Sequence, residues 1–355
     1  MTGWISEWHE PAPGQVSPVD DRSSAKDVLF RLEAGEVLRW AGDFHNGRQF
    51  LGAVKKRLAR RRRNLPSGLG ERWRAHRDAR SEQATIIGRL VIRLEADGSI
   101  QLRRAPDTRR AIELAWGTSQ VQRLVGFSTL LGAISAASWT ERRLDVPGLN
   151  GRLTPHYGVF SPTRHVYVQM LQDLPDVRGK SVLDVGCGTG VLAFVLLQRG
   201  AVEAVGTDID ERSVRCAAFN AEALGLPFRA VLADLWSDDL VADLVVFNAP
   251  WMPEAPRTRL DRAVYDDNGD TLARWLRELP RHLTADGRGV LLVSDLPELL
   301  GLRETGELER EIEAAGLRIV NVYRRPAVHR KTKESDDPLH AARAAEQVCM
   351  WVLGF

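Results

Sequence analysis

The sequence has little cysteine and no long hydrophobic run. Its 355 residues include three cysteines, Cys187, Cys216 and Cys349, and no two of them form a CxxC pair. A disulfide framework and a four-ligand zinc site are therefore not expected. No HExxH motif or metal-ligand histidine spacing occurs, so we predict no catalytic metal. No apolar stretch approaches the roughly 18 residues that a membrane helix needs, so we expect no membrane span.

The N-terminal residues MTGWISEWHEPAPGQ lack the basic flank and apolar stretch of a secretory signal. The composition, 44% hydrophobic and 27% charged, is that of a globular protein. We therefore expect a soluble, cytoplasmic protein. The length suggests about two domains, and the turn-rich segment from Asp145 to Gly151 predicts their boundary. The predicted domains are residues 1–150 and 151–355.

The charge is unevenly distributed along the chain. Residues 1–150 contain 25 Lys and Arg against 17 Asp and Glu, whereas the remaining residues contain 24 against 30. Much of the basic excess lies in one run, which comprises Lys55, Lys56, Arg57, Arg60, Arg61, Arg62 and Arg63. Such a run is typical of a surface that binds nucleic acid. It is equally typical of a solvated helix end, where cations offset the helix dipole.

The first 150 residues show mainly helical patterns. Ser24 and Asp27 resemble a capping box, and apolar residues at near-helical spacing follow as far as Trp40. Further helices are expected over 44–63, 71–85, 108–116 and 128–142. The runs 90–94 and 100–102, separated by Asp97-Gly98, predict a β-hairpin. The predicted N-terminal domain is thus mainly helical with one hairpin.

From Lys180 onward, short β-rich runs alternate with amphipathic stretches. Strands are expected over 181–185, 201–208, 228–233, 243–248, 290–294, 317–323 and 347–353. Helices are expected over 191–198, 211–224, 271–283 and 304–315. This alternation predicts an α/β fold with seven strands in a mostly parallel sheet and helices on both faces.

A glycine-rich loop follows the first of these strands, in the stretch VLDVGCGTG. Gly186, Gly188 and Gly190 allow a sharp turn and a close approach to a ligand. The GxGxxG pattern of dinucleotide-binding loops is interrupted because residue 191 is Val. The GK[ST] ending of a phosphate-binding loop is also absent. The loop therefore predicts a different ligand.

Acidic residues occur at the ends of three successive predicted strands. Asp184 ends the first, Asp208 the second and Asp234 the third. A carboxylate in the second position can accept hydrogen bonds from both ribose hydroxyls, and ligands of open α/β sheets bind at these strand ends. Asp234 and Leu235 could contact the amino group and the face of an adenine. Each acid alone could instead cap a loop; Asp210 is expected to cap the next helix.

These motifs, LDVGCGTG, VGTDID, AAFNAEALG and VLADL, resemble the class I S-adenosylmethionine-dependent methyltransferases. The resemblance covers roughly residues 150–355 and implies a seven-stranded Rossmann-like sheet with S-adenosylmethionine as cofactor. It implies that the glycines border the methionine portion, that Asp184 orients it, that Asp208 binds the ribose and that Asp234 contacts the adenine. The implied cofactor residues are Asp184, Gly186, Cys187, Gly188, Gly190, Asp208, Ile209, Asp234, Leu235 and Asn248.

A segment before the glycine loop, LTPHYGVFSPTRH, matches the position that closes over the cofactor in related enzymes. By that resemblance Tyr157, Phe160 and Thr163 are further cofactor contacts. A loop that packs between domains is the alternative.

The fourth strand ends in LVVFNAPWMP, which resembles the Asn-Pro-Pro-Tyr motif of methyltransferases acting on planar nitrogens, including the release-factor glutamine methyltransferase branch. We predict that Asn248, Pro250 and Trp251 are the catalytic residues. Asn248 would accept an N–H of the acceptor, Pro250 would stiffen the turn and Trp251 would stack on a planar group. Ala249 replaces the usual proline, which leaves open a degenerate motif with an oxygen or non-planar amine acceptor.

The loop after this motif contains Tyr265 and Asp266, which, with Trp251, are predicted to bind the substrate. Three functional hypotheses remain from the sequence. The first is an N-methyltransferase of a macromolecule, either rRNA or protein, with residues 1–150 docking the substrate. The second is an N-methyltransferase of a small amino- or guanidino-bearing metabolite, in which residues 1–150 form a lid or a homodimer surface. The third is a non-catalytic cofactor-binding module.

Overall fold

In the computed structural model, residues 3–7, 11–60, 66–328, 332 and 337–355 are described, and the chain divides into two units, Met1–Glu141 and Arg142–Phe355. The predicted boundary lies later than this one. It falls between β6 (Leu144–Asp145) and β7 (Arg152–Leu153), which pair with each other. Val146 and Leu149 from this segment are buried in the core of the C-terminal unit. The turn-rich segment is therefore an ordered part of that unit and not a linker.

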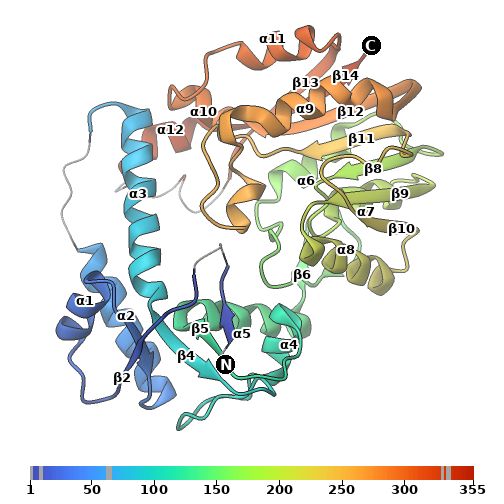
Figure 1. The fold of residues 1–355 in the computed structure, drawn as a ribbon. Helices are drawn as coiled ribbons and strands as arrows, with labels where there is room; N and C mark the ends of the chain where they lie inside the picture. The colour runs from blue at the N-terminus through green and yellow to red at the C-terminus, as the bar shows by residue number, and fades with distance from the viewer. Residues whose placement is uncertain (1–2, 8–10, 61–65, 329–331, 333–336) are drawn as a thin grey trace. The chain divides into compact units, whose positions relative to one another are not determined.

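The C-terminal unit contains a seven-stranded sheet among the residues that are described (Figure 1). Its strands, in order across the sheet, are β10 (Phe228–Leu232), β9 (Glu203–Asp208), β8 (Ser181–Val185), β11 (Ala242–Asn248), β12 (Leu283–Ser294), β14 (Gln347–Gly354) and β13 (Arg318–Pro326). The first five are parallel, and β14 is antiparallel to both of its neighbours. The carboxyl ends of β8 to β11 therefore lie along one edge.

Helices cover both faces of this sheet. They are α6 (Val166–Met170), α7 (Val191–Gln198), α8 (Glu211–Leu224), α9 (Asp270–Glu278), α10 (Leu296–Leu299), α11 (Glu307–Ala314) and α12 (His340–Ala345). Successive strand residues point to opposite faces. Thus Val182 and Val246 pack with α6 and α7, whereas Leu183 and Val245 pack with α9 and α11. The continuous apolar runs of the strands follow from this double burial.

The predicted helices next to the glycine loop have the observed bounds. For α7 and α8 the apolar pattern and the end signals agree. Asp210 caps α8, as predicted, by accepting a hydrogen bond of 2.9 Å from the backbone N–H of Arg212, and Gly225 ends the helix in a left-handed conformation.

Among its described residues, the N-terminal unit contains a mixed five-stranded sheet, where the sequence predicted mainly helices and one hairpin. The strand order is β1 (Gly3–Ile5), β5 (Arg123–Gly126), β4 (Leu90–Leu94), β3 (Val37–Trp40) and β2 (Val16–Val19). The helices are α1 (Ala25–Glu33), α2 (Phe44–Ala59), α3 (Leu69–Gly88), α4 (Arg109–Trp116) and α5 (Phe127–Arg142).

Two predictions for this unit are wrong. The helix expected as far as Trp40 ends at Glu33, because Gly35 takes φ +96° and residues 37–40 continue as β3, with Leu38 and Trp40 buried. The expected hairpin does not form. Its turn is present, since Gly98 N–H donates to Glu95 O at 2.9 Å, but residues 100–102 form no strand.

The physical reason is that the turn packs on α4 instead of returning along β4. The Thr108 hydroxyl donates to Gly98 O at 2.7 Å, and Ile112 lies directly against Gly98. β4 pairs instead with β3 in parallel and with β5 in antiparallel orientation.

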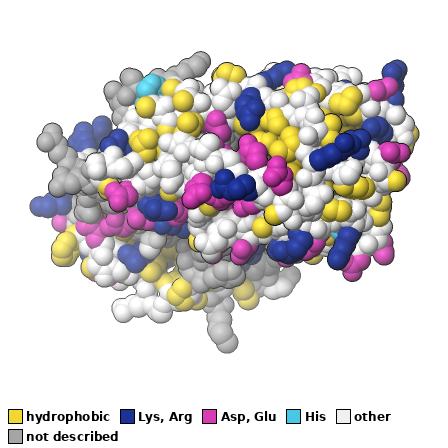
Figure 2. Space-filling view, turned by 90° about the horizontal axis from the view of Figure 1, so that it is seen from above, with side chains coloured by type: hydrophobic (Ala, Val, Ile, Leu, Met, Phe, Trp, Pro, Cys, Tyr) yellow, Lys and Arg dark blue, Asp and Glu magenta, His cyan; other side chains and the backbone are white. Residues whose placement is uncertain are grey.

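The basic run lies at the end of α2 and beyond it. Lys55, Lys56, Arg57 and Arg60 are exposed, and the ammonium of Lys55 donates to the Ser128 hydroxyl at 2.9 Å. Arg61, Arg62 and Arg63 lie outside the described residues. Figure 2 shows one face of the molecule, on which basic and acidic side chains are interspersed.

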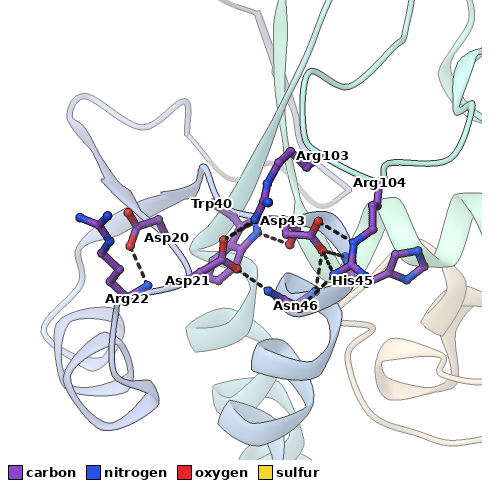
Figure 3. A network of polar contacts seen from close by, with 9 residues as sticks. All are labelled: Asp20, Asp21, Arg22, Trp40, Asp43, His45, Asn46, Arg103 and Arg104. Carbon is purple, nitrogen blue, oxygen red and sulfur yellow. Dashed lines mark hydrogen bonds and ion pairs between the residues drawn. The ribbon is translucent and has the colours of Figure 1, made fainter.

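A polar network in the N-terminal unit centres on Asp43, whose side chain is 1% exposed (Figure 3). Its carboxylate accepts backbone N–H bonds from His45 and Asn46 and so caps α2. It also accepts two bonds of 2.8 Å from Arg104. This ion pair ties the start of α2 to the loop that precedes α4.

Across the described part of the chain, no helix is both long enough and apolar enough to cross a membrane.

Candidate functional site

A cavity of about 410 Å³ opens at the carboxyl ends of β8, β9, β10 and β11, within the C-terminal unit. Ligands of open α/β sheets bind at this edge. Of the predicted residues, those that line the cavity are Phe160, Gly186, Cys187, Gly188, Asp208, Ile209, Asp234, Leu235, Asn248, Pro250, Tyr265 and Asp266. Asp184, Gly190, Tyr157, Thr163 and Trp251 are not part of its lining.

The glycine loop connects β8 to α7 and forms one wall of the cavity. Gly188 has φ +54°, and a Cβ built at this residue would have no atom within 4 Å. Its backbone thus faces open space that a ligand can fill. Gly190 has a different role from the predicted one. A Cβ at this residue would lie 2.2 Å from the ring of Phe194, so this glycine permits close packing beneath the loop.

Asp208 lies at the end of β9 and faces the cavity. Its two oxygens accept backbone N–H bonds from Gly188 at 3.0 Å and from Asp210 at 2.9 Å. These bonds fix the carboxylate between the glycine loop and the start of α8. Burial raises the pKa of Asp208. The Ser213 side chain is a third hydrogen-bond partner of this carboxylate, so a further acceptor position remains for a ligand hydroxyl.

Asp184 is fully buried beneath the loop and does not reach the cavity. One oxygen accepts the N–H of Ala193 at 3.1 Å and so fixes the first turn of α7. The other oxygen has no hydrogen-bond partner among the described residues. Burial raises the pKa of Asp184 to about 7, and the nearby charge of Asp208 adds to this effect. Asp184 was predicted to orient the ligand, but in this position its side chain does not line the cavity.

The loop after β10 supplies Asp234 and Leu235. Leu235 has φ +63°, and its carbonyl oxygen accepts a bond of 2.6 Å from the Thr207 hydroxyl, which fastens the loop to β9. The Asp234 carboxylate pairs with Arg274 of α9 at 3.1 Å. Ile209, which follows Asp208, is 53% exposed and lines the same cavity.

Asn248 ends β11, the strand next to β8, and therefore lies beside the glycine loop. Its side-chain amide makes no hydrogen bond to the described residues. Ala249 is fully buried, and its N–H donates to Leu292 O at 3.2 Å. Among the described residues the Ala249 carbonyl accepts no backbone hydrogen bond. Asn248 thus offers an acceptor group in the cavity wall, whereas Ala249 is not part of the lining.

Two predicted substrate residues have structural roles. Trp251 packs against the hydrophobic cluster on one face of the sheet. Its backbone is held in this position because the backbone N–H groups of Trp251 and Met252 both donate to Val264 O. Asp266 borders the cavity, but its oxygens accept the N–H groups of Thr271 and Leu272 at 2.9 and 3.0 Å. It therefore caps α9.

The segment before β8 contributes differently from the prediction. Phe160 lines the cavity, whereas Tyr157 lies under the guanidinium of Arg212 at 5.7 Å and Thr163 is exposed. Tyr167 of α6 lines the cavity and is 8% exposed. Burial raises its pKa, and the nearby Asp184 adds to that increase. The sequence did not single it out, because the run VYVQML is typical of a core helix.

The residues at this edge suit an adenosine-bearing ligand that carries an amino-acid group. The open backbone at Gly188 admits a chain, the Asp208 carboxylate can accept from a ribose hydroxyl, and Ile209 and Leu235 offer apolar contacts for a base. A family model of ribosomal protein L11 methyltransferases (PrmA) matches residues 161–249 of the sequence. That stretch includes the glycine loop, Asp208, Asp234 and Asn248. The family match and the relatives described below indicate a class I S-adenosylmethionine-dependent methyltransferase, and its cofactor is S-adenosylmethionine.

Individual relatives are similar over parts of the chain. A Methanocaldococcus jannaschii protein, provisionally described as a protein N5-glutamine methyltransferase, is 29% identical over 160 residues, which cover 43% of this chain and 80% of the relative. The ribosomal protein L11 methyltransferase of Actinobacillus pleuropneumoniae is 44% identical over 89 residues, 24% of this chain and 30% of the relative. The chain thus spans less than a third of the length of this second relative.

A solved structure is also similar. The ribosomal protein L11 methylase of Lactobacillus delbrueckii subsp. bulgaricus is 19% identical with a TM-score of 0.38, and the match covers 58% of this chain and 81% of that one.

Proposed function

We propose that this methyltransferase acts on a planar nitrogen of a macromolecule, either protein or RNA. The observation that carries the proposal is the position of Asn248, at the end of β11 and in the wall of the cofactor cavity. The names of two relatives, which specify a protein glutamine and a ribosomal protein, favour the same class of acceptor.

The chemistry required of the chain is orientation. An amide or base amine is a poor nucleophile because its lone pair is delocalised. The Asn248 side-chain oxygen and the Ala249 carbonyl would each accept one N–H of the acceptor, so the nitrogen can become pyramidal as it attacks. The bound cofactor supplies an electrophilic methyl group. Since the nitrogen loses its proton only once it carries positive charge, no strong base is needed, and orientation with electrostatic stabilisation provides the acceleration.

Ala249 in place of proline is compatible with this mechanism. The backbone carbonyl is unchanged by the substitution, and the alanine is held by its own N–H bond to β12 and by full burial. Pro250 lines the cavity, and its ring restricts the backbone φ at this point.

We propose that the N-terminal unit docks the macromolecule. Four exposed cations, Lys55, Lys56, Arg57 and Arg60, give it a basic surface at the end of α2. Contacts with phosphates make affinity strongly dependent on salt, whereas binding of a neutral metabolite is insensitive to it. A small-molecule acceptor, with the N-terminal unit as a lid or dimer surface, is the alternative outcome of the test below.

The test uses radiolabelled S-adenosylmethionine and a cell extract, separated into RNA, protein and small-molecule fractions. The Asn248→Ala variant runs beside the wild type as the catalytic control. A variant with Lys55, Lys56, Arg57 and Arg60 all changed to Gln tests docking. We expect label in protein or RNA that is lost with Asn248→Ala and reduced in the fourfold variant, whose cofactor affinity is unchanged.

Label confined to small molecules would contradict the macromolecular acceptor and favour a small-molecule acceptor. Equal label with wild type and Asn248→Ala would contradict the role of Asn248.

A further inference from the structure

Two arginines that follow the Asn248 motif form ion pairs across the cofactor cavity. Arg259 contacts Asp210, with 3.9 Å between nitrogen and oxygen, and Arg274 contacts Asp234 at 3.1 Å. All four side chains belong to residues that line the cavity. Neither arginine was singled out from the sequence, because each lies in an ordinary charged stretch.

The two pairs connect opposite sides of the cavity. In the sheet order β10-β9-β8-β11, the acids follow β9 and β10 and the arginines follow β11. The acids therefore belong to the side where Asp208 would hold the ribose. Arg259 belongs to the loop that continues from the proposed acceptor site, and Arg274 belongs to α9, which follows that loop. The ion pairs thus join this loop and α9 to the adenosine side.

The segment that carries Arg259 is ordered at both its base and its tip. At the base, Asp266 N–H donates to Met252 O at 2.9 Å, beside the bonds from Trp251 and Met252 to Val264. At the tip, the Asp261 carboxylate accepts the N–H of Arg257 at 3.0 Å. These bonds hold residues 260–263 in a single 3-10 turn. The tip is thus a defined structure that faces the cavity.

Two exposed aliphatic side chains accompany the Arg259–Asp210 pair. Leu260 follows Arg259 and is 48% exposed, and Ile209 precedes Asp210 and is 53% exposed. Both line the cavity. Leu260 and Ile209 can therefore enclose a flat apolar ring, because both side chains line one cavity and the residues next to them are joined by an ion pair.

We propose that residues 254–263 form a flap over the bound adenosine. Leu260 covers the base from the side opposite Ile209, and the Arg259–Asp210 pair holds the flap closed. The Arg274–Asp234 pair, outside the flap, joins α9 to the loop after β10 at the same cavity. Arg259 and Arg274 are positioning residues. The proposal rests on the cofactor site and is independent of which acceptor the enzyme methylates.

The test measures binding, without turnover. Leu260→Ala, Arg259→Ala and Arg274→Ala are compared with wild type by calorimetric titration and by the dissociation rate of bound ligand. The two ligands are S-adenosylhomocysteine and 5′-methylthioadenosine, which share the adenosine but differ in the amino-acid end. Arg277→Ala is the matched control, since Arg277 lies on α9, pairs with Glu278 and does not line the cavity.

Leu260→Ala is expected to raise the Kd of both ligands by the same factor, about fivefold, because a partly buried leucine contributes roughly this much. Each arginine variant is expected to raise both dissociation rates about threefold, as is typical of exposed ion pairs, and to weaken their dependence on salt. Arg277→Ala should leave them unchanged.

An unchanged Kd for both ligands in Leu260→Ala, with a wild-type unfolding temperature, would overturn the flap. An effect on S-adenosylhomocysteine alone would place Leu260 at the amino-acid end and also overturn it. Absence of binding in the wild type would instead contradict the cofactor site.

Discussion

The carboxylate of Asp43 and the guanidinium of Arg104 are joined by two parallel hydrogen bonds of 2.8 Å, although the residues are 61 positions apart. Asp43 also caps α2 through His45 and Asn46. Arg104 itself has φ +54°, which is unusual for a residue other than glycine. The bidentate geometry therefore keeps both the helix start and a strained backbone in place.

Arg104→Ala is expected to lower the stability of the N-terminal unit, because it leaves the buried Asp43 carboxylate without its cation. Arg103→Ala is the control, since Arg103 is 78% exposed and contacts Asp21 at 3.6 Å. Thermal unfolding should separate the two variants clearly. Arg104 holds the pKa of Asp43 well below its usual range. This stabilisation is therefore present above the ordinary pKa of an aspartate and is lost as the pH falls below it.

Gly190→Ala and Gly188→Ala should separate packing from ligand binding. At Gly190 a Cβ would clash with Phe194, so we expect the free energy of unfolding to fall by about 2–4 kcal/mol. At Gly188 the space is open, and the left-handed backbone alone costs about 1 kcal/mol. Gly188→Ala should nevertheless weaken cofactor binding, because the new methyl group occupies the space for the ligand. Equal losses of stability in the two variants would contradict this division.

Asn248→Ala and Asp208→Ala should affect different steps. Asn248→Ala is expected to preserve cofactor affinity and lower turnover more than tenfold, a loss of at least about 1.4 kcal/mol of transition-state stabilisation. Asp208→Ala should instead raise the Kd for the cofactor, since it removes an acceptor for the ribose hydroxyls. Calorimetry and single-turnover rates measure the two effects. Unchanged turnover in Asn248→Ala would refute the planar-nitrogen mechanism.

Asp184→Asn should alter how stability depends on pH. With a folded-state pKa raised to about 7 from 3.8, the folded chain keeps a proton that the unfolded chain has released between these values. The free energy of unfolding therefore decreases as the pH rises through this window and is level above it. Asn removes this contribution, which is about 4 kcal/mol over the whole window. Denaturant titrations at pH 5 and pH 8 test it; an identical change in both proteins would exclude the effect.

The sequence predicted the C-terminal unit more accurately than the N-terminal one, for local reasons. The strands around the glycine loop are short apolar runs between clear turn and cap residues, so their pattern and their ends agree. In the N-terminal unit, residues 37–40 are apolar at spacings that suit either a helix or a strand. Their strand state depends on pairing with β2 and β4, which are distant in sequence.

Within the candidate site, motifs predicted the residues on the strand ends and missed those that reach them from elsewhere. Asp208 and Asn248 follow strands and face the cavity. Trp251 follows the same motif but turns toward the sheet, because its backbone pairs with Val264. Arg274 reaches Asp234 from a helix 40 residues further along the chain. Such contacts depend on how the helix packs, which no local pattern encodes.

The pairing of β1 with β5 has a consequence for biosynthesis. Among the described residues, Gly3–Ile5 pair with Arg123, Leu124 and Val125 alone, so the first strand of the N-terminal unit cannot pair until the last one has been translated. β5 pairs on its other side with β4. The sheet can therefore close only after residue 126 has left the ribosome, and until then three strands present an unpaired edge that is prone to aggregation. A fusion or truncation that disturbs residues 3–5 would act first on the yield of folded protein.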